Sequence, residues 1–268
     1  MSDIDIRPLR TLDELRACVT LQRETWGDEF TDVVPTSILK VSQRIGGVAA
    51  GAFDDTGKLL GFVYGLTGVQ DGRIVHWSDM LAVRPEARNY GLGRRLKEFQ
   101  RKAVQKLGGV VIYWTYDPLV ARNAHLNFNH LGAGVAEYVE DMYEGELFSD
   151  LAKGIGTDRF VVSWRLASER VARALRDKRA GCEEPFRQAP VANPGGALRE
   201  LRELPAAPRV RVEIPEDVQA VKTARPEAAV AWRESTRRAF EGYLARGYRV
   251  EAFYRDPAER RCYYGLEA

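Results

Sequence analysis

The sequence contains few residues that bind metals or form disulfides. Its histidines and cysteines are His76, His125, His130, Cys18, Cys182 and Cys262. No Cys-x-x-C occurs and the histidines are not spaced as metal ligands, so we expect no metal site. The cysteines are odd in number and far apart, which suits a reducing cytoplasm better than a disulfide framework.

Net charge and long apolar runs are also scarce. The formal net charge is only +2, which gives no general attraction to nucleic acid or to a membrane surface. No apolar run reaches about 18 residues, and the opening Met-Ser-Asp-Ile-Asp lacks the basic start of a signal peptide. With 45% hydrophobic and 29% charged residues, the 268-residue chain is expected to be a cytoplasmic globular protein of one large or two smaller domains.

The most informative stretch covers residues 79–97 and reads as a strand, a short turn and a basic helix. Residues 81–83 suit a buried strand, and Pro85 cannot continue it. Gly91 and Gly93 allow a sharp turn and a close approach of the backbone to a ligand. Because the first N–H groups of the following helix are unpaired and carry positive potential, this turn predicts a diphosphate site.

The motif Val-x-Pro-x-x-x-x-x-Gly-x-Gly, with Arg88 three residues before the first glycine, resembles the pyrophosphate loop R/Q-x-x-G-x-G/A of the GNAT N-acyltransferases. The resemblance implies acetyl-CoA or another acyl-CoA as cosubstrate and no metal. A nucleotide-binding P-loop is the other interpretation of a glycine turn before a helix, but its Gly-Lys-Ser/Thr is absent. The cofactor-binding residues that the resemblance indicates in this loop and the strand before it are Leu81, Ala82, Val83, Arg88, Asn89, Tyr90, Gly91, Leu92, Gly93 and Arg94.

Hydrophobic periodicity predicts elements in the order β-α-α-β-β-β-α-β-α-β-β over residues 4–166, which is the GNAT order. The resemblance therefore implies an α/β (α+β) GNAT fold in a domain of residues 1–167: a mixed, mostly antiparallel, splayed sheet flanked by helices. Residues 168–268 are expected to form an extension with a proline- and glycine-rich connector at about 188–209. After the connector we expect a smaller β-α-β-β unit that packs against the first domain or extends its sheet.

The resemblance implies that an amine attacks the thioester directly in a ternary complex, while a strand N–H stabilises the oxyanion. The amine must lose a proton, and the departing thiolate takes one up. The family often has a tyrosine for the second step, three residues before the Leu-Gly that ends the helix after the fifth strand. That position is Phe128 here. Asp79 as base and Tyr143 as acid are the catalytic candidates, with a solubilising edge charge and an ordinary sheet aromatic as the alternatives.

Further candidates lie on two predicted helices. Asn123 and Asn127 are spaced i and i+4, so they share a helical face and could contact pantetheine or substrate. Glu24 and Trp26 lie near the end of the first helix, where acceptors usually bind in the resembled family. They are therefore the candidate substrate-binding residues.

The sequence thus predicts an N-acyltransferase whose acceptor is a small-molecule amine or an amino acid, since no acidic groove for a basic peptide is evident. Acetyl is the expected group, and the nearby arginines leave a succinyl donor open. A second hypothesis is a GNAT-fold module that binds acyl-CoA to regulate or scaffold without turnover, which Phe128 favours. A homodimer is expected from the family, and no nucleic-acid or membrane partner is expected.

Overall fold

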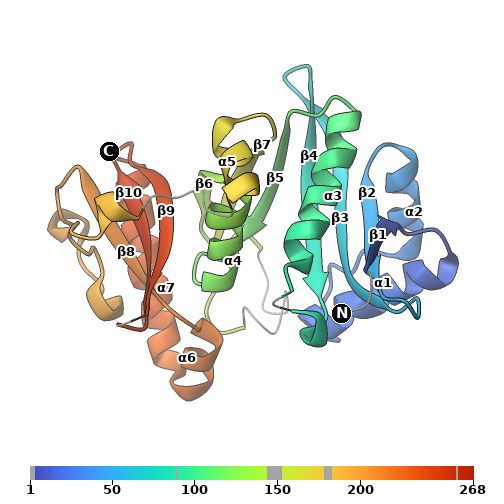
Figure 1. Ribbon diagram of the computed structural model, residues 1–268. Coiled ribbons are helices and arrows are strands. Elements are labelled where there is room, and N and C mark those ends of the chain that lie inside the picture. The colour runs from blue at the N-terminus through green and yellow to red at the C-terminus, as the bar shows by residue number, and fades with distance from the viewer. Residues whose placement is uncertain (1–3, 89, 144–152, 178–182, 258) are drawn as a thin grey trace. The chain divides into compact units, whose positions relative to one another are not determined.

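The structure is a computed structural model that describes residues 4–88, 90–143, 153–177, 183–257 and 259–268 (Figure 1). The chain forms two compact units, and each is described by itself below. Of the described residues, unit 1 comprises those up to 114 together with 164–167, and unit 2 comprises the others. The predicted domain boundary at residues 167 and 168 stays a prediction.

Unit 1 consists of a mixed sheet and three helices among its described residues. Its elements are β1 (Asp5–Pro8), α1 (Leu12–Trp26), α2 (Thr36–Arg44), β2 (Val48–Phe53), β3 (Leu59–Gln70), β4 (Arg73–Val83), a 3-10 turn (Pro85–Ala87), α3 (Leu92–Lys106) and the first four residues of β5 (Val111–Tyr116). The strand order is β1-β2-β3-β4-β5, in which only β4 and β5 run parallel. The predicted mixed, mostly antiparallel sheet is confirmed.

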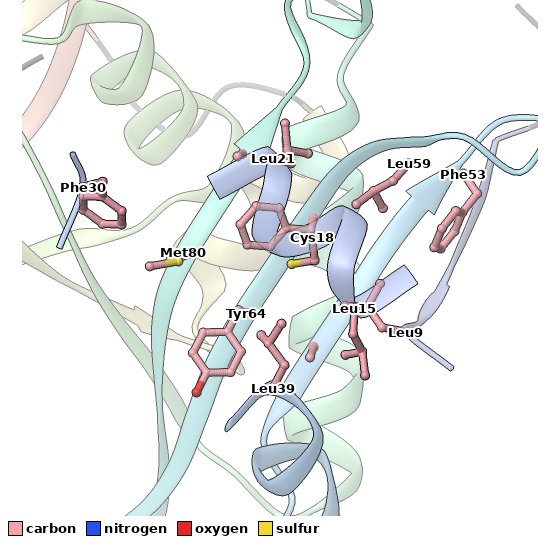
Figure 2. Packing of buried hydrophobic residues seen from close by; sticks show 13 residues of the cluster. Leu9, Leu15, Cys18, Leu21, Phe30, Leu39, Phe53, Leu59, Tyr64 and Met80 are labelled. Atoms are coloured by element: carbon pink, nitrogen blue, oxygen red, sulfur yellow. The ribbon is translucent and has the colours of Figure 1, made fainter. Parts of the chain in front are cut away.

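The first helix begins at a capping box. The Thr11 hydroxyl accepts from the Glu14 N–H (3.2 Å), and the Glu14 carboxylate accepts from the Thr11 N–H (3.3 Å), which completes a capping box. Side chains of α1, α2 and the strands then meet in one hydrophobic cluster (Figure 2). Burial in this cluster raises the pKa of the Cys18 thiol to about 12, so Cys18 is a packing residue and not a nucleophile.

Unit 2 contains two small groups of strands. Its elements are the end of β5, α4 (Ala121–His125), a π-helical turn η2 (Leu126–Leu131), β6 (Gly134–Val139), most of β7 (Arg159–Arg165), α5 (Glu169–Asp177), 3-10 turns at Glu184–Phe186, Pro194–Gly196 and Leu201–Glu203, β8 (Arg209–Pro215), α6 (Val218–Ala224), α7 (Pro226–Leu244), β9 (Arg249–Asp256) and β10 (Arg261–Glu267). β6 and β7 pair antiparallel, and β8-β10-β9 form a separate antiparallel sheet. The described strands of the extension therefore build a sheet of their own and are not paired with the first one.

The short helix α6 was not predicted. Asp217 caps it, since its carboxylate accepts from the N–H groups of Gln219 (3.0 Å) and Ala220 (3.1 Å). The helix ends at Arg225, directly before Pro226 starts α7. Two sequence signals for a separate short helix were therefore available: the capping Asp217 at its start and Pro226 at the start of the helix that follows.

An aromatic cluster forms the core of unit 2. The ring centroid of Phe160 in β7 lies 4.6 Å from that of Phe240 in α7 and 5.6 Å from that of Tyr264 in β10. Phe128 of η2 meets the Tyr264 ring edge-on at 5.8 Å. Elements on both sides of residue 167 thus share one core.

Candidate functional site

The glycine turn lies between β4 and α3, as predicted. Gly91 has φ of +71° and ψ of 12°, a left-handed conformation that favours glycine, and it is the N-cap residue of α3. The first helical hydrogen bond runs from the Arg95 N–H to the Gly91 carbonyl (3.1 Å), so the N–H groups of residues 92–94 precede the helical ladder. No side chain among the described residues caps Gly91, which leaves this helix start suited to an anion.

Basic side chains surround the turn, but two of them also serve the fold. The Arg88 Nε donates to the Val83 carbonyl (3.1 Å), which ties the turn to the end of β4. The Arg94 Nε donates to the Glu98 carboxylate one helical turn on (2.6 Å). The Tyr90 side chain is 60% exposed beside them, whereas Asn89 lies outside the described residues.

Strand β4 contains a bulge halfway along its length. Where β3 advances by two residues, from Tyr64 to Leu66, β4 advances by three, from Met80 to Trp77. One extra residue in β4 therefore lies at positions 78–79. A continuous alternation of residue types hides this bulge in the sequence.

Because of the bulge, the even-numbered side chains of β4 lie on one face of the sheet before it and on the opposite face after it. Before it, His76 and Ser78 hydrogen-bond to side chains of α3. After it, Met80 and Ala82 lie in the hydrophobic cluster under α1. Without the extra residue, all four even-numbered side chains would share one face.

Strand β4 also loses its neighbour at the bulge. The last pair between β4 and β5 is Trp77 with Tyr113, and no later pair of these strands occurs in the described part of the chain. The Arg84 N–H donates to a β3 carbonyl (2.8 Å), so the main-chain groups of Leu81 and Val83 point away from β3 by alternation. They face the side that β5 has left, as pantetheine binding would require.

A chain of buried polar groups runs behind the bulge, between β4 and α3. The Lys97 Nζ donates to the Ser78 Oγ (2.7 Å), and Gln100 lies 3.0 Å from the His76 Nε2. The His76 Nδ1 in turn lies 2.9 Å from the Thr67 hydroxyl. This network was not predicted from the sequence, because Lys97 is one of several basic residues of its helix and nothing in the sequence distinguishes it from the exposed ones.

His76 makes unit 1 sensitive to acid. Burial, and then repulsion from the Lys97 ammonium, lower the pKa of His76 to about 4. Since the unfolded pKa is near 6.5, the stabilising effect of neutral His76 is complete above pH 6.5 and is lost as the pH falls toward 4. We expect a loss of about 3 kcal/mol in the free energy of unfolding from this group, measured by urea titration at pH 7 and pH 4.

The control for this prediction is His76→Gln, which keeps polar atoms but cannot titrate. Its unfolding free energy should fall less between the two pH values than that of the wild type. An equal fall in both proteins would show that His76 is not the group that titrates.

The structure places the two catalytic candidates in different units. Asp79 belongs to the β4 bulge of unit 1, where it reaches solvent but is partly enclosed by neighbouring groups. Desolvation by the surrounding protein, and then repulsion from Asp32, raise the pKa of Asp79, which makes it a better base than an ordinary carboxylate. Tyr143 belongs to unit 2, where its hydroxyl lies 2.9 Å from that of Thr115 at the end of β5.

Phe128, at the position where the resembled family often has a catalytic tyrosine, lies in the hydrophobic core of unit 2. Phe128 is fully buried, and its ring packs on that of Tyr264, whose hydroxyl lies 3.2 Å from the Tyr116 hydroxyl. Burial raises the pKa of both, and the Tyr264 hydroxyl donates to the Pro118 carbonyl (2.8 Å). These buried hydroxyls are poor proton donors for a departing thiolate.

Asn123 and Asn127 do not share a regular helical face. The chain changes from the α-helix α4 to the π-helical turn η2 between them, so the i, i+4 geometry is broken. Asn127 is buried at 3% exposure, and Asn123 is half-buried. Of the two, Asn123 is the better placed to meet a ligand.

The acceptor candidates both have structural partners. The Glu24 carboxylate pairs with the Arg84 guanidinium at 2.5 Å, which joins α1 to the residue after β4. The Trp26 ring stacks on Phe30 (5.5 Å between centroids) and meets Phe62 edge-on at 6.3 Å. Glu24 thus lies beside the loop segment, and Trp26 packs on the hydrophobic cluster.

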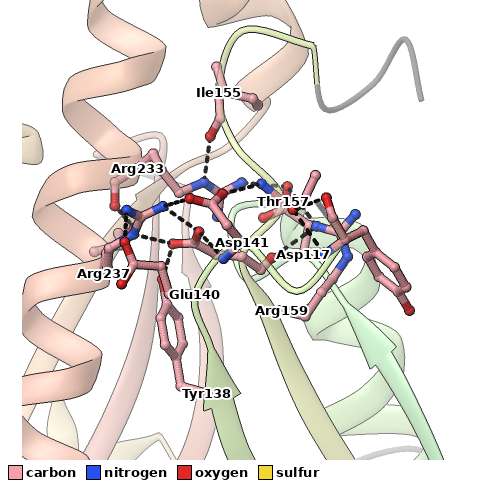
Figure 3. Close-up of polar contacts among 12 residues, drawn as sticks. Asp117, Tyr138, Glu140, Asp141, Ile155, Thr157, Arg159, Arg233 and Arg237 are labelled. Carbon is pink, nitrogen blue, oxygen red and sulfur yellow. Dashed lines mark hydrogen bonds and ion pairs between the residues drawn. The ribbon is translucent and has the colours of Figure 1, made fainter. Parts of the chain in front are cut away.

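Unit 2 holds a cluster of buried charges that the sequence did not reveal (Figure 3). Arg233 of α7 is 3% exposed, and it donates to the Asp117 carboxylate (2.7 Å) and to the Ile155 carbonyl (2.9 Å). Arg159 lies 4.0 Å from the same carboxylate. Asp117 directly follows β5, so α7 fixes the end of that strand.

Arg237, one helical turn later, binds three carboxylates (Figure 3). It pairs with Asp158 (2.5 Å), Asp141 (3.2 Å) and Glu140. Burial opposes ionisation of Asp158, but hydrogen bonds from Arg237 and from the Tyr138 hydroxyl outweigh it and lower the pKa of Asp158. This cluster pairs its arginines with carboxylates from other segments and so holds the elements of unit 2 together.

The described ranges contain neither a metal-binding cluster nor a membrane-spanning helix. No group of three or more histidine, cysteine or acidic side chains there has the arrangement of a metal site. No helix in those ranges is long and apolar enough to cross a bilayer.

Comparison with known proteins gives structural relatives only. No protein-family model and no curated protein matches the chain. Among solved structures, a GNAT-family acetyltransferase from Streptococcus pneumoniae is 19% identical, with a TM-score of 0.46 over 60% of this chain and 98% of its own. An aminoglycoside 6′-N-acetyltransferase with coenzyme A is 15% identical, with a TM-score of 0.46 over 62% and 98%.

A third solved structure is a chain of the NatC complex bound to a Gag peptide and CoA. It is 16% identical, with a TM-score of 0.49 over 62% of this chain and 99% of that one. Such distant similarities concern the fold and do not identify a donor or an acceptor. All three structures are 15–19% identical to this chain and align with it at TM-scores below 0.5.

Proposed function

We propose that the protein is an acyl-CoA-dependent N-acyltransferase. It moves an acyl group, with acetyl as the expected one, to an amine of a small molecule or an amino acid. One observation carries this proposal. The start of α3, which no described side chain caps, follows β4 after a short turn. At its bulge β4 parts from β5, and the main chain of Leu81 and Val83 faces the vacated side. A diphosphate on the turn and a pantetheine along β4 would together place a thioester near the bulge.

The chemistry follows from this placement. A neutral amine attacks the thioester carbonyl carbon, the C–N bond forms, and the oxygen takes up the negative charge near main-chain N–H groups of β4. The C–S bond then breaks, and the thiolate leaves with coenzyme A. Asp79, with its raised pKa, accepts the amine proton directly or through water. The thiolate is protonated by water, because Phe128 has no proton to give.

The test is release of coenzyme A thiol from acetyl-CoA and succinyl-CoA with a panel of small amines, amino acids and short peptides. Amine-dependent release that follows saturation kinetics in both substrates would support the proposal. The matched binding experiment is calorimetry with coenzyme A alone. No heat of binding by the folded protein would end the proposal.

A non-catalytic acyl-CoA-binding module is the second candidate, and the buried Phe128 favours it. In that case coenzyme A would raise the melting temperature, but no amine of the panel would release thiol. The two experiments together therefore separate transfer from binding.

A further inference from the structure

The side chain of Lys97 fills the place where β4 and β5 part. Its Nζ donates to the Ser78 Oγ (2.7 Å) and lies 3.7 Å from the ring centroid of Trp114. Ser78 and Trp114 each come directly after the last residue pair between the two strands. One lysine thus contacts both strands at the vertex of the gap.

A lysine is a costly residue at this position. Lys97 is 2% exposed, and in the described part of the chain no carboxylate pairs with it. Burial without such a partner lowers the pKa of Lys97 well below its usual range. A well-packed hydrophobic side chain of similar volume would stabilise the fold at least as well.

The contacts of Lys97 show what the lysine provides instead. Its three acceptors are the Ser78 hydroxyl, the Trp114 ring and, at 3.5 Å, the Gln100 side-chain oxygen. Together they fix the first residue of the bulge against both α3 and β5. Gly65 of β3 leaves room for this network, because a Cβ there would stand 2.4 Å from His76 and 2.9 Å from Gln100.

The geometry points to Lys97 as a positioning residue that sets the β4 bulge, and through it the main-chain N–H groups that meet the thioester oxygen. This inference rests on the proposed function. Lys97 lies behind the strand and touches neither substrate, so it acts through Ser78. Errors of about 1 Å in the position of such donors lower rates by about 100-fold, whereas the phosphate-binding turn is left unchanged.

The first test measures thiol release by Lys97→Met, which keeps an unbranched side chain, one atom shorter, and removes its hydrogen bond. The expected result is a 10- to 100-fold lower kcat, with a KM for acyl-CoA within about threefold of the wild type. Ser78→Ala should lower kcat in the same direction, and the double variant should be no slower than Lys97→Met alone. Lys102→Met, on the exposed face of α3, is the matched control and should behave as wild type.

The second test is independent of turnover. Amide hydrogen exchange should accelerate at residues 78–81 in Lys97→Met and in Ser78→Ala, but not at residues 48–53 of β2. If the wild type releases no thiol, the proposed function fails and the exchange data decide the role of Lys97. Unchanged exchange at residues 78–81, or an additive loss of kcat in the double variant, would overturn the inference. If Lys97→Met does not fold, the same measurements of exchange and kcat on Ser78→Ala test the inference.

Discussion

Replacing Gly93 by aspartate is expected to weaken acyl-CoA binding by about 100-fold or more without lowering the stability of the protein. Gly93 is the second residue of α3 and has helical backbone angles, so aspartate fits the chain there. A carboxylate in the first turn of a helix contributes about 0.3–1 kcal/mol of stability. The same carboxylate would stand where we propose that the diphosphate binds, and such like-charge contacts cost several kcal/mol.

Calorimetry with coenzyme A measures the expected loss of affinity, and thermal unfolding measures the expected unchanged stability. Gly93→Ala and Gly93→Asn are the matched controls, since they add a side chain without adding charge. Both should bind coenzyme A far better than Gly93→Asp. If Gly93→Asp binds as tightly as the wild type, the phosphates do not lie at this helix start.

Replacing Asp117 by asparagine is expected to destabilise unit 2 by about 3 kcal/mol. The Asp117 carboxylate neutralises Arg233, which is 97% buried, and removing one partner of a buried ion pair leaves the other charge uncompensated. Asparagine keeps a side-chain oxygen to accept from the Leu119 N–H, as Asp117 does at 2.8 Å. The loss of stability in Asp117→Asn should therefore come from the missing negative charge and not from a lost hydrogen bond to the Leu119 N–H.

Urea unfolding followed by circular dichroism measures this loss. Asp177→Asn is the matched control, because Asp177 pairs with Arg176 at the surface and should contribute less than about 0.5 kcal/mol. The double variant Asp117→Asn with Arg233→Met should recover part of the stability, since it removes the stranded charge. A loss below 1 kcal/mol in Asp117→Asn would mean that water reaches Arg233.

The sequence predicts most of unit 1 because its signals are local. The capping box at Thr11, the glycine turn at Gly91 and the alternation in the strands each involve residues within a few positions of one another. The bulge in β4 was missed because residues 76–82 keep the same alternation on both sides of it. Gly65 was the available signal, since a lone glycine within a strand indicates a bulge or a close approach.

Unit 2 was less predictable because its contacts join distant parts of the chain. Arg233 and Asp117 are separated by 116 positions, and neither residue is unusual in its own segment. Asn123 and Asn127 were expected on one face because a π-helical turn has no clear sequence signal. The departure at Phe128 was visible in the sequence, but the packing of its ring on the buried Tyr264 was not.

The shared aromatic core of unit 2 limits how the protein can be shortened. A fragment that ends near residue 167 keeps Phe160 and Phe128 but loses Phe240 and Tyr264, which cover them. Such a fragment would present uncovered rings to solvent and would tend to aggregate. The last hundred residues are therefore a structural requirement of the preceding fold, and assays of a truncated protein would measure misfolding instead of catalysis.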